Sequence, residues 1–139
     1  RVHSLDRRFC AILLRLAELD ALVGGAPRTP AGIAACAREL QRAGAQAILL
    51  PLGREGALLI PAAGDTLYLA APQVDPVQPV GAADSMAAGW LYAQEKGYYA
   101  PEALRFAVAA GAAALLSEWL PSRAAIENML AQTGAPQAV

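Results

Sequence analysis

Residues 80–90 of this chain are Val-Gly-Ala-Ala-Asp-Ser-Met-Ala-Ala-Gly-Trp, a run of small residues that leads into an apolar stretch and carries one carboxylate, Asp84. The pattern predicts a glycine turn followed by the start of a helix. The first N–H groups of a helix have no partner within the helix, and with the helix dipole they favour an anion such as a phosphate. A carboxylate there can accept the proton of a hydroxyl that attacks phosphorus. Aspartate is also a preferred N-cap residue, so this segment leaves both a helix cap and a catalytic base open.

The composition of the chain indicates one α/β domain and excludes two classes of function. The chain has 139 residues and a formal net charge of −1 at pH 7, and its basic residues are scattered. A domain of this length can bury a sizeable core. A nucleic-acid-binding surface is not expected, because it requires a stripe of Lys and Arg. The longest apolar run, 106–116, is too short to span a bilayer, so no membrane insertion is expected.

The cysteines and the single histidine favour neither a metal site nor a histidine-based catalytic triad. Cys10 and Cys36 lack the C-x-x-C spacing of metal and redox sites, and their apolar neighbours are typical of reduced core cysteines. His3 lies in a polar segment, where we expect a solvated side chain. The polar start of the chain does not have the form of a signal peptide, and we expect a cytoplasmic protein.

Apolar spacing and turn residues predict alternating helices and strands in the first part of the chain. One helix is expected over 7–23, ended by a glycine pair, and a second over 29–44 with Thr29 as its N-cap. The continuous apolar run 46–50 predicts a strand that is buried on both faces. Helix, turn and buried strand together indicate the crossover half of a β-α-β unit.

The second part of the chain predicts a hairpin followed by helices. Strands are expected over 57–60 and 66–70, joined at a turn that contains Gly64. The proline-rich segment 72–79 is expected to be an extended connection, because proline removes a ladder hydrogen bond. The helices are then expected over 84–95, 101–116 and 122–132.

Three motifs follow one another in a characteristic order. Residues 52–60 are Leu-Gly-Arg-Glu-Gly-Ala-Leu-Leu-Ile, residues 81–85 are Gly-Ala-Ala-Asp-Ser, and residues 107–114 are Ala-Val-Ala-Ala-Gly-Ala-Ala-Ala. This order resembles the C-terminal part of the PfkB (ribokinase-like) family of carbohydrate kinases, which pairs an L-G-x-x-G-A-L turn with a G-A-G-D-S signature and a small-residue helix. Within that family, residues 84–89 and 102–105 are most similar to 1-phosphofructokinases and tagatose-6-phosphate kinases.

The resemblance covers residues 18–130 and implies both a fold and a reaction. The implied fold is a ribokinase-like α/β domain, a three-layer αβα sandwich of which residues 1–139 supply the C-terminal, ATP-binding half without the sugar-binding half and the lid. The implied reaction is transfer of the γ-phosphate of ATP to fructose 1-phosphate, which gives fructose 1,6-bisphosphate, with Mg²⁺.

The resemblance also implies roles for individual residues. Asp84 matches the catalytic base that deprotonates the sugar hydroxyl. The start of its helix matches the anion hole that neutralises charge on the transferred phosphoryl group, with Gly81, Ala82 and Ala83 beside Asp84. Matches to nucleotide-contacting positions are Gly53, Arg54, Glu55, Gly56 and Ala57 in the turn, and Ala109, Ala110, Gly111 and Ala112 on the adenine side. Plain turn glycines and simple helix packing stay open as alternatives for these two segments.

The chain departs from the family pattern at three places. Ala83 stands where the family usually has Gly, and its methyl costs about 1 kcal/mol if the position requires a positive φ or close approach to a phosphate. Upstream, the family's Lys-Pro-Asn-x-x-Glu-Leu aligns with residues 13–19, where Arg15 replaces the Asn and Glu18 is retained. Arg15 cannot ligate a cation, so Glu18 is either a magnesium-site residue acting through water or a solvated carboxylate. Finally, family members are considerably longer.

Two functions from different classes follow from these observations. The first is a kinase that acts on a sugar phosphate, and the second is a truncated, inactive homologue that serves as a nucleotide-binding or interaction module. A sheet built from this chain alone exposes a strand edge and an apolar face, so a homodimer, a completing chain or a longer kinase stays open. A dinucleotide-binding domain has little support, because no G-x-G-x-x-G follows a first strand.

Overall fold

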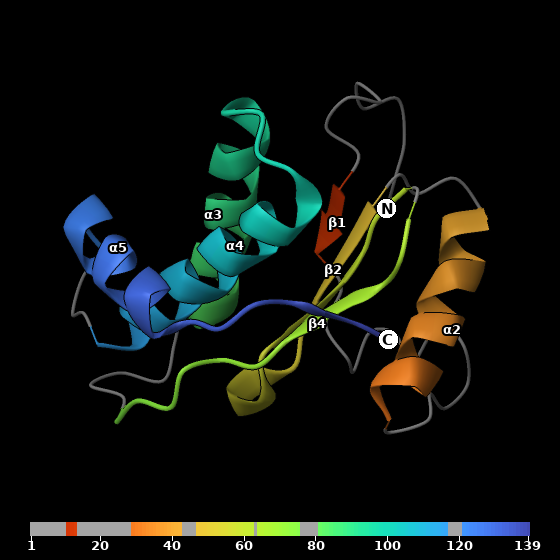
Figure 1. Cartoon of the computed structure of the whole chain (residues 1–139), viewed down its shortest axis with the longest axis horizontal. Coiled ribbons are helices and arrows are strands. Elements are labelled where there is room, and N and C mark those ends of the chain that lie inside the picture. The colour runs from red at the N-terminus through yellow and green to blue at the C-terminus, as the bar shows by residue number, and fades with distance from the viewer. Residues whose placement is uncertain (1–10, 14–28, 43–46, 63, 76–80, 117–120) are drawn as a thin grey trace.

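The molecule consists of helices on both faces of a central sheet. The computed structural model describes residues 11–13, 29–42, 47–62, 64–75, 81–116 and 121–139. In Figure 1, α2 (Pro30–Arg42) covers one face of the sheet, and α3 (Ala82–Glu95) and α4 (Ala100–Leu115) cover the other. The last helix, α5 (Arg123–Gln132), packs on α4 away from the sheet. This arrangement confirms the predicted three-layer α/β fold.

The strands of the sheet lie side by side in the order in which the chain makes them. In the described residues they are β1 (Ala11–Leu13), β2 (Ala47–Pro51), β3 (Ala57–Ile60), β4 (Leu67–Leu69) and β5 (Gln137–Ala138). β1 and β2 are parallel with α2 between them, which confirms the predicted β-α-β unit. The other pairs are antiparallel, and the predicted β3–β4 hairpin is among them. The sequence did not predict β5.

The predicted helix over 7–23 is wrong where the structure describes this segment. Ala11–Leu13 form the strand β1, in register with Ala47–Leu49 of β2. A short apolar run has no periodicity that separates a buried strand from a buried helix, so the pattern alone could not decide. Pairing with a neighbouring buried strand satisfies the backbone N–H and C=O groups and favours the strand. The rest of the predicted helix lies outside the described residues.

The other helices agree with the sequence to within two residues at each described end. Gly32 N donates to Thr29 Oγ1 at 3.1 Å, which confirms Thr29 as the cap of α2. α3 begins at Ala82, two residues before its predicted start. At α5, Ser122 is the N-cap, and its side chain accepts a hydrogen bond from Ala125 N at 3.1 Å. None of the described helices combines the length and apolar character that crossing a membrane needs.

The core has two parts because successive residues of β2 and β3 point to opposite faces of the sheet. Leu49 and Leu59 face α3 and α4, where they join Met86, Trp90, Leu104 and Val108. Ile48, Leu50, Leu58 and Ile60 face α2, where they join Ile33 and Ala37. These strand side chains are at most 2% exposed, which confirms the prediction that the strand after α2 is buried on both faces.

Polar side chains of α2 fasten the β3–β4 hairpin to the helix. The Arg38 guanidinium donates to Gly64 O at 2.7 Å, to Pro61 O at 3.2 Å and to Thr66 Oγ1 at 3.3 Å. Gln41 Nε2 donates to Pro61 O at 2.7 Å. Thr66 is buried, so its hydroxyl depends on partners within the protein. The role of Arg38 is therefore structural.

Replacing Arg38 with methionine should lower the free energy of unfolding by about 1.5–3 kcal/mol, because bonds to a charged donor are lost and carbonyls lose their partners. Urea unfolding followed by circular dichroism measures the change. Arg42→Met is the matched control, since the Arg42 side chain is 76% exposed and pairs with the similarly exposed Glu39 at 4.0 Å. Equal losses in the two variants would contradict the role of Arg38.

The segment after α5 returns to the sheet and forms its last strand. Arg105 of α4 donates to Leu130 O and Gly134 O, each at 3.0 Å, and to Thr133 O at 3.2 Å. Leu130 O also accepts the N–H of the C-cap Thr133 at 3.1 Å, so Arg105 adds a second donor there and holds the carbonyls just beyond the end of α5. Val139 N then donates to Thr66 O at 3.0 Å beside β5. One arginine thus orients the chain for its return to β4.

Candidate functional site

The start of α3 is an open helix N-terminus with a carboxylate in its first turn. Gly81 is the N-cap, in the left-handed conformation with φ of 98°, and Ser85 N donates to Gly81 O at 2.9 Å. Asp84 is exposed and lies inside the helix, so its interpretation as the N-cap is wrong. Because Gly81 has no side chain, the N-cap residue supplies no side-chain acceptor to the first N–H groups, which include those of Ala82 and Ala83.

The alanine that departs from the family pattern does not strain the backbone. Ala83 lies within α3, whereas the positive φ at this turn belongs to Gly81. A methyl group is well tolerated in helical conformation, and alanine is the best helix former. The cost expected for a positive φ at Ala83 therefore does not arise, which leaves only close approach to a phosphate as a possible penalty.

Replacing Ala83 with glycine should lower the free energy of unfolding by about 0.5–1 kcal/mol, because glycine loses more backbone entropy in a helix. We expect the affinity for ATP to stay the same. Thermal unfolding and calorimetric titration with ATP measure the two quantities. Ala88→Gly, at an exposed position in the same helix, reports the cost of helix propensity alone. A gain in ATP affinity only in Ala83→Gly would show that the methyl obstructs the phosphate.

The turn between β2 and β3 is a short 3-10 helix, η2 (Gly53–Glu55), that a tyrosine holds from β4. Tyr68 donates its hydroxyl to Glu55 O at 2.5 Å, and Leu52 N donates to Gly56 O at 2.8 Å. Gly56 is buried with φ of 110°, and a Cβ there would lie 1.9 Å from Leu69 O. Packing against β4 therefore explains why Gly56 is glycine. Gly53 and Glu55 are exposed, and a Cβ at Gly53 would meet nothing within 4 Å.

The small residues of α4 lie in the contacts between helices. Ala109, Ala110 and Ala112 are at most 5% exposed, and Ala109 and Ala112 cluster with Met129 of α5. A Cβ on the buried Gly111 would lie 3.2 Å from Ala82 O. The structure thus gives these residues a packing role, and their contact with the adenine base stays a prediction. Ala57, the last residue of the predicted nucleotide turn, is also fully buried.

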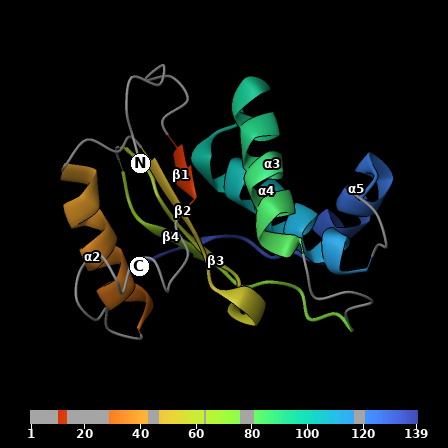
Figure 2. The same ribbon diagram turned by 180° about the vertical axis from the view of Figure 1, so that it is seen from behind.

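The three motifs converge on one end of the sheet. Gly111 brings the C-terminal part of α4 against the start of α3, through its contact with Ala82. Figures 1 and 2 both place η2 and the start of α3 at the same end of the sheet. η2 directly follows β2, so this is the end where the parallel strand β2 finishes. Ligands of open α/β sheets bind outside the carboxyl ends of their strands.

The predicted magnesium residue cannot be placed. Glu18 and Arg15 lie outside the described residues, as do His3 and Cys10, whereas Cys36 is half-buried and free. Within the described ranges, no group of three or more His, Cys, Asp or Glu side chains could hold a metal ion. A magnesium site formed by Glu18 therefore stays a prediction.

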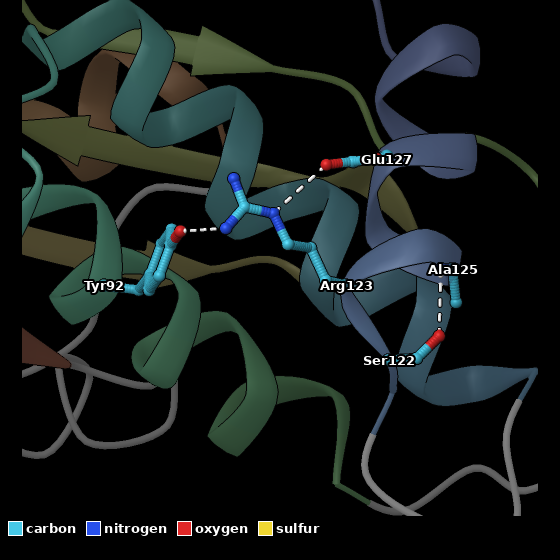
Figure 3. A network of polar contacts seen from close by, with 5 residues as sticks. All are labelled: Tyr92, Ser122, Arg123, Ala125 and Glu127. Carbon is cyan, nitrogen blue, oxygen red and sulfur yellow. Dashed lines mark hydrogen bonds and ion pairs between the residues drawn. The ribbon is translucent and has the colours of Figure 1, made fainter.

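A second polar cluster, which the sequence did not predict, joins α3 and α5. Arg123 donates through Nη1 to Tyr92 Oη at 2.6 Å and through Nε to Glu127 Oε1 at 3.1 Å (Figure 3). The hydrogen bond with Glu127 and the nearby Tyr92 raise the pKa of Arg123 above its ordinary value. The spacing of Arg123 and Glu127 on one helix indicates their pairing. Nothing in the sequence points to Tyr92, because it lies on another helix.

The fold and the motifs agree with those of known carbohydrate kinases. Residues 12–119 match the family described as pfkB family carbohydrate kinase. The 1-phosphofructokinase of Haloferax volcanii is 38% identical over 107 residues, which are 76% of this chain and 34% of that protein. The chain spans about a third of the length of the curated relatives it matches.

Solved kinase structures superpose on most of the chain. Phosphofructokinase-2 from Escherichia coli, in complex with substrates and products, has a TM-score of 0.78 and 29% identity, over 87% of this chain and 40% of that chain. Ribokinase from Arabidopsis thaliana, complexed with ribose and ATP, has a TM-score of 0.77 and 25% identity, over 86% of this chain and 40% of that chain. Sequence, fold and motif order agree, and the chain belongs to the pfkB family of carbohydrate kinases.

Proposed function

We propose that this chain is the ATP-binding part of a hexose-phosphate kinase that converts fructose 1-phosphate to fructose 1,6-bisphosphate. The observation that carries the proposal is the start of α3, where an exposed carboxylate, Asp84, lies in the first turn of a helix whose N-cap residue, Gly81, has no side chain. The substrate is proposed from the curated relatives, which are named 1-phosphofructokinase. ATP and sugar phosphates are cytoplasmic metabolites, so we also propose a cytoplasmic location.

In the proposed reaction, the α3 start holds the phosphoryl group and Asp84 takes the proton. The N–H groups of Ala82 and Ala83 and the positive end of the helix stabilise the charge on the transferred group. The oxygen of the sugar hydroxyl forms a bond to the γ-phosphorus, and Asp84 accepts the proton of that hydroxyl. The bond from that phosphorus to the bridging oxygen breaks, and ADP leaves with the electron pair. Mg²⁺, when bound with ATP, neutralises phosphate charge, and we propose that Glu18 contacts it through water.

The nucleotide is proposed to lie between η2 and α4. Gly53 leaves its backbone open to a ligand, since a Cβ there would meet nothing within 4 Å. We propose that Gly53–Ala57 contact the nucleotide and that Ala109–Ala112 limit the adenine side. The convergence of η2, the α3 start and α4 supports this placement.

A coupled assay that detects ADP tests the proposed reaction. The protein is offered ATP, Mg²⁺ and one of fructose 1-phosphate, tagatose 6-phosphate or fructose 6-phosphate. We expect ADP formation to depend on the sugar and to be fastest with fructose 1-phosphate. Faster turnover of another sugar would change the substrate assignment. Absence of sugar-dependent ADP formation would contradict the proposed kinase activity.

The second candidate is an inactive homologue that binds a nucleotide or a partner. It is favoured by the length of the chain, about a third of that of its curated relatives. In the described part, β1 pairs on one side only, with β2, so a homodimer or another chain is proposed to complete the sheet. ATP binding without sugar-dependent ADP formation would support this candidate. An in-frame extension upstream of Arg1 that encodes a sugar-binding half would instead support the enzyme.

A further inference from the structure

A cavity of about 260 Å³ lies between α3, α4 and α5. Gly89 of α3 and Ala110 and Phe106 of α4 line it, together with Tyr92 of α3 and Ile126 of α5. Arg123 lines it from the first turn of α5. Of the residues proposed to serve the kinase reaction, only Ala110 belongs to this lining. The cavity is therefore largely separate from the proposed active site.

Small side chains and a polar bridge keep this cavity open. A Cβ on Gly89 would lie 2.9 Å from Ala110 Cβ, so α3 and α4 are in direct contact and neither contributes a bulky side chain there. Across the opening, the hydrogen bond of 2.6 Å from Arg123 to Tyr92 ties α5 to α3 (Figure 3). The space is thus bounded on three sides by helices whose separations are fixed by contacts.

The lining is mainly apolar and includes two aromatic rings and one arginine, Arg123, whose side chain is 66% exposed. The Tyr92 ring stacks on Phe106, with centroids 5.1 Å apart. Two cations lie over the Tyr92 ring, with Lys96 Nζ at 5.5 Å and Arg123 Cζ at 5.6 Å from its centroid, and of these two only Arg123 lines the cavity. The hydrogen bonds of Arg123 use Nε and Nη1, and none in the described part of the chain uses Nη2. Glu127 pairs with Arg123 at 3.1 Å and so offsets the charge of that arginine.

We infer that this cavity binds a planar aromatic monocarboxylate. Its ring lies against Tyr92, Phe106 and Ile126, and its carboxylate pairs with the Arg123 guanidinium, whose planar donors match carboxylate oxygens. An apolar cavity of about 150 Å³ holds benzene. The larger volume here therefore has room for a bicyclic ring. Ser85, which lines the cavity and follows Asp84, places such a ligand against the first turn of α3.

Calorimetric titration of the full chain with 2-naphthoate tests the inference without any activity assay. We expect saturable binding, at least about tenfold weaker binding of the neutral isostere 2-naphthamide, and no displacement by ATP. Absence of saturable 2-naphthoate binding would overturn the inference. Equal binding of the amide would overturn the anionic class, and displacement by ATP would assign the cavity to the nucleotide site instead.

Two variants and one control locate the ligand. Arg123→Gln should weaken 2-naphthoate binding about tenfold or more, because a charge-assisted pair is lost. Ala88→Leu, at an exposed position of the lining, should fill the opening and abolish binding. Arg42→Gln removes an exposed arginine of α2 and should bind as the wild type does. Circular dichroism verifies that each variant is folded. If Arg123→Gln unfolds, the binding measured with Ala88→Leu decides whether 2-naphthoate occupies the cavity. Wild-type affinity in both cavity variants would overturn the inference.

Discussion

Replacing Asp84 with asparagine is expected to lower the rate of sugar phosphorylation by roughly 10²–10⁴-fold, the range that a positioned general base contributes. Asparagine has nearly the same size as aspartate and keeps the first turn of α3 intact, but its amide does not accept the proton of the hydroxyl. We therefore expect a loss in kcat with the KM for ATP close to the wild-type value.

The coupled ADP assay measures this rate, on the form of the protein that phosphorylates fructose 1-phosphate. Asp65→Asn is the matched control, because Asp65 is an exposed carboxylate in the β3–β4 turn, outside the proposed site. Its rate should equal that of the wild type. If Asp84→Asn also keeps the full rate, Asp84 is not the base, and the carboxylate in α3 serves only the helix dipole.

Replacing Gly56 with alanine is expected to destabilise the fold by about 2–6 kcal/mol, because a strained backbone and an overpacked contact each cost about 1–3 kcal/mol. The backbone has φ of 110°, and the new Cβ would lie 1.9 Å from Leu69 O and 2.9 Å from Ala70 Cα. Both obstacles are backbone atoms of the segment paired with β3, so no side-chain rotation removes the clash. A native domain is stable by about 5–15 kcal/mol, so a large share would be lost.

The matched control for Gly56 lies three residues away in the same turn. Gly53 also has a positive φ, of 62°, but a Cβ there would meet nothing within 4 Å. Gly53→Ala should therefore cost only about 1 kcal/mol, the price of the left-handed conformation. Urea unfolding of both variants separates conformation from contact. Similar stabilities would show that β4 yields to the new methyl.

The sequence predicted the parts of the fold that have local signals. Thr29 and Ser122 are typical N-caps, and both lie where the helices α2 and α5 begin. The run 57–60 matches β3 residue for residue. β1 was missed because a continuous apolar run fits a strand and a helix equally well, and only its partner β2 decides. β5 was missed because Gln137 and Ala138 have no strand pattern in the sequence. They form a strand because they pair with β4.

In the site, too, the features with a local sequence signal were predicted and those set by tertiary contacts were not. The small residues before Asp84 predicted a helix start, and the structure adds that Gly81, rather than Asp84, is the cap. The reason for Gly56 was not visible in the sequence, because it depends on the carbonyl of Leu69 in another strand. The bridge between Arg123 and Tyr92 likewise joins residues from separate helices. Contacts of this kind follow from tertiary packing, which one sequence does not display.

The order of the strands has a consequence for how the chain folds. β2, β3 and β4 are neighbours in both sequence and space, so short turns close their contacts at a small cost in loop entropy. β5 follows α3, α4 and α5 in the chain, and Arg105 holds the end of α5, so we expect β5 to pair with β4 after these helices have docked. The central meander can therefore form early and locally. We expect the far edge of the sheet to close later, because its last strand depends on the docking of the helices.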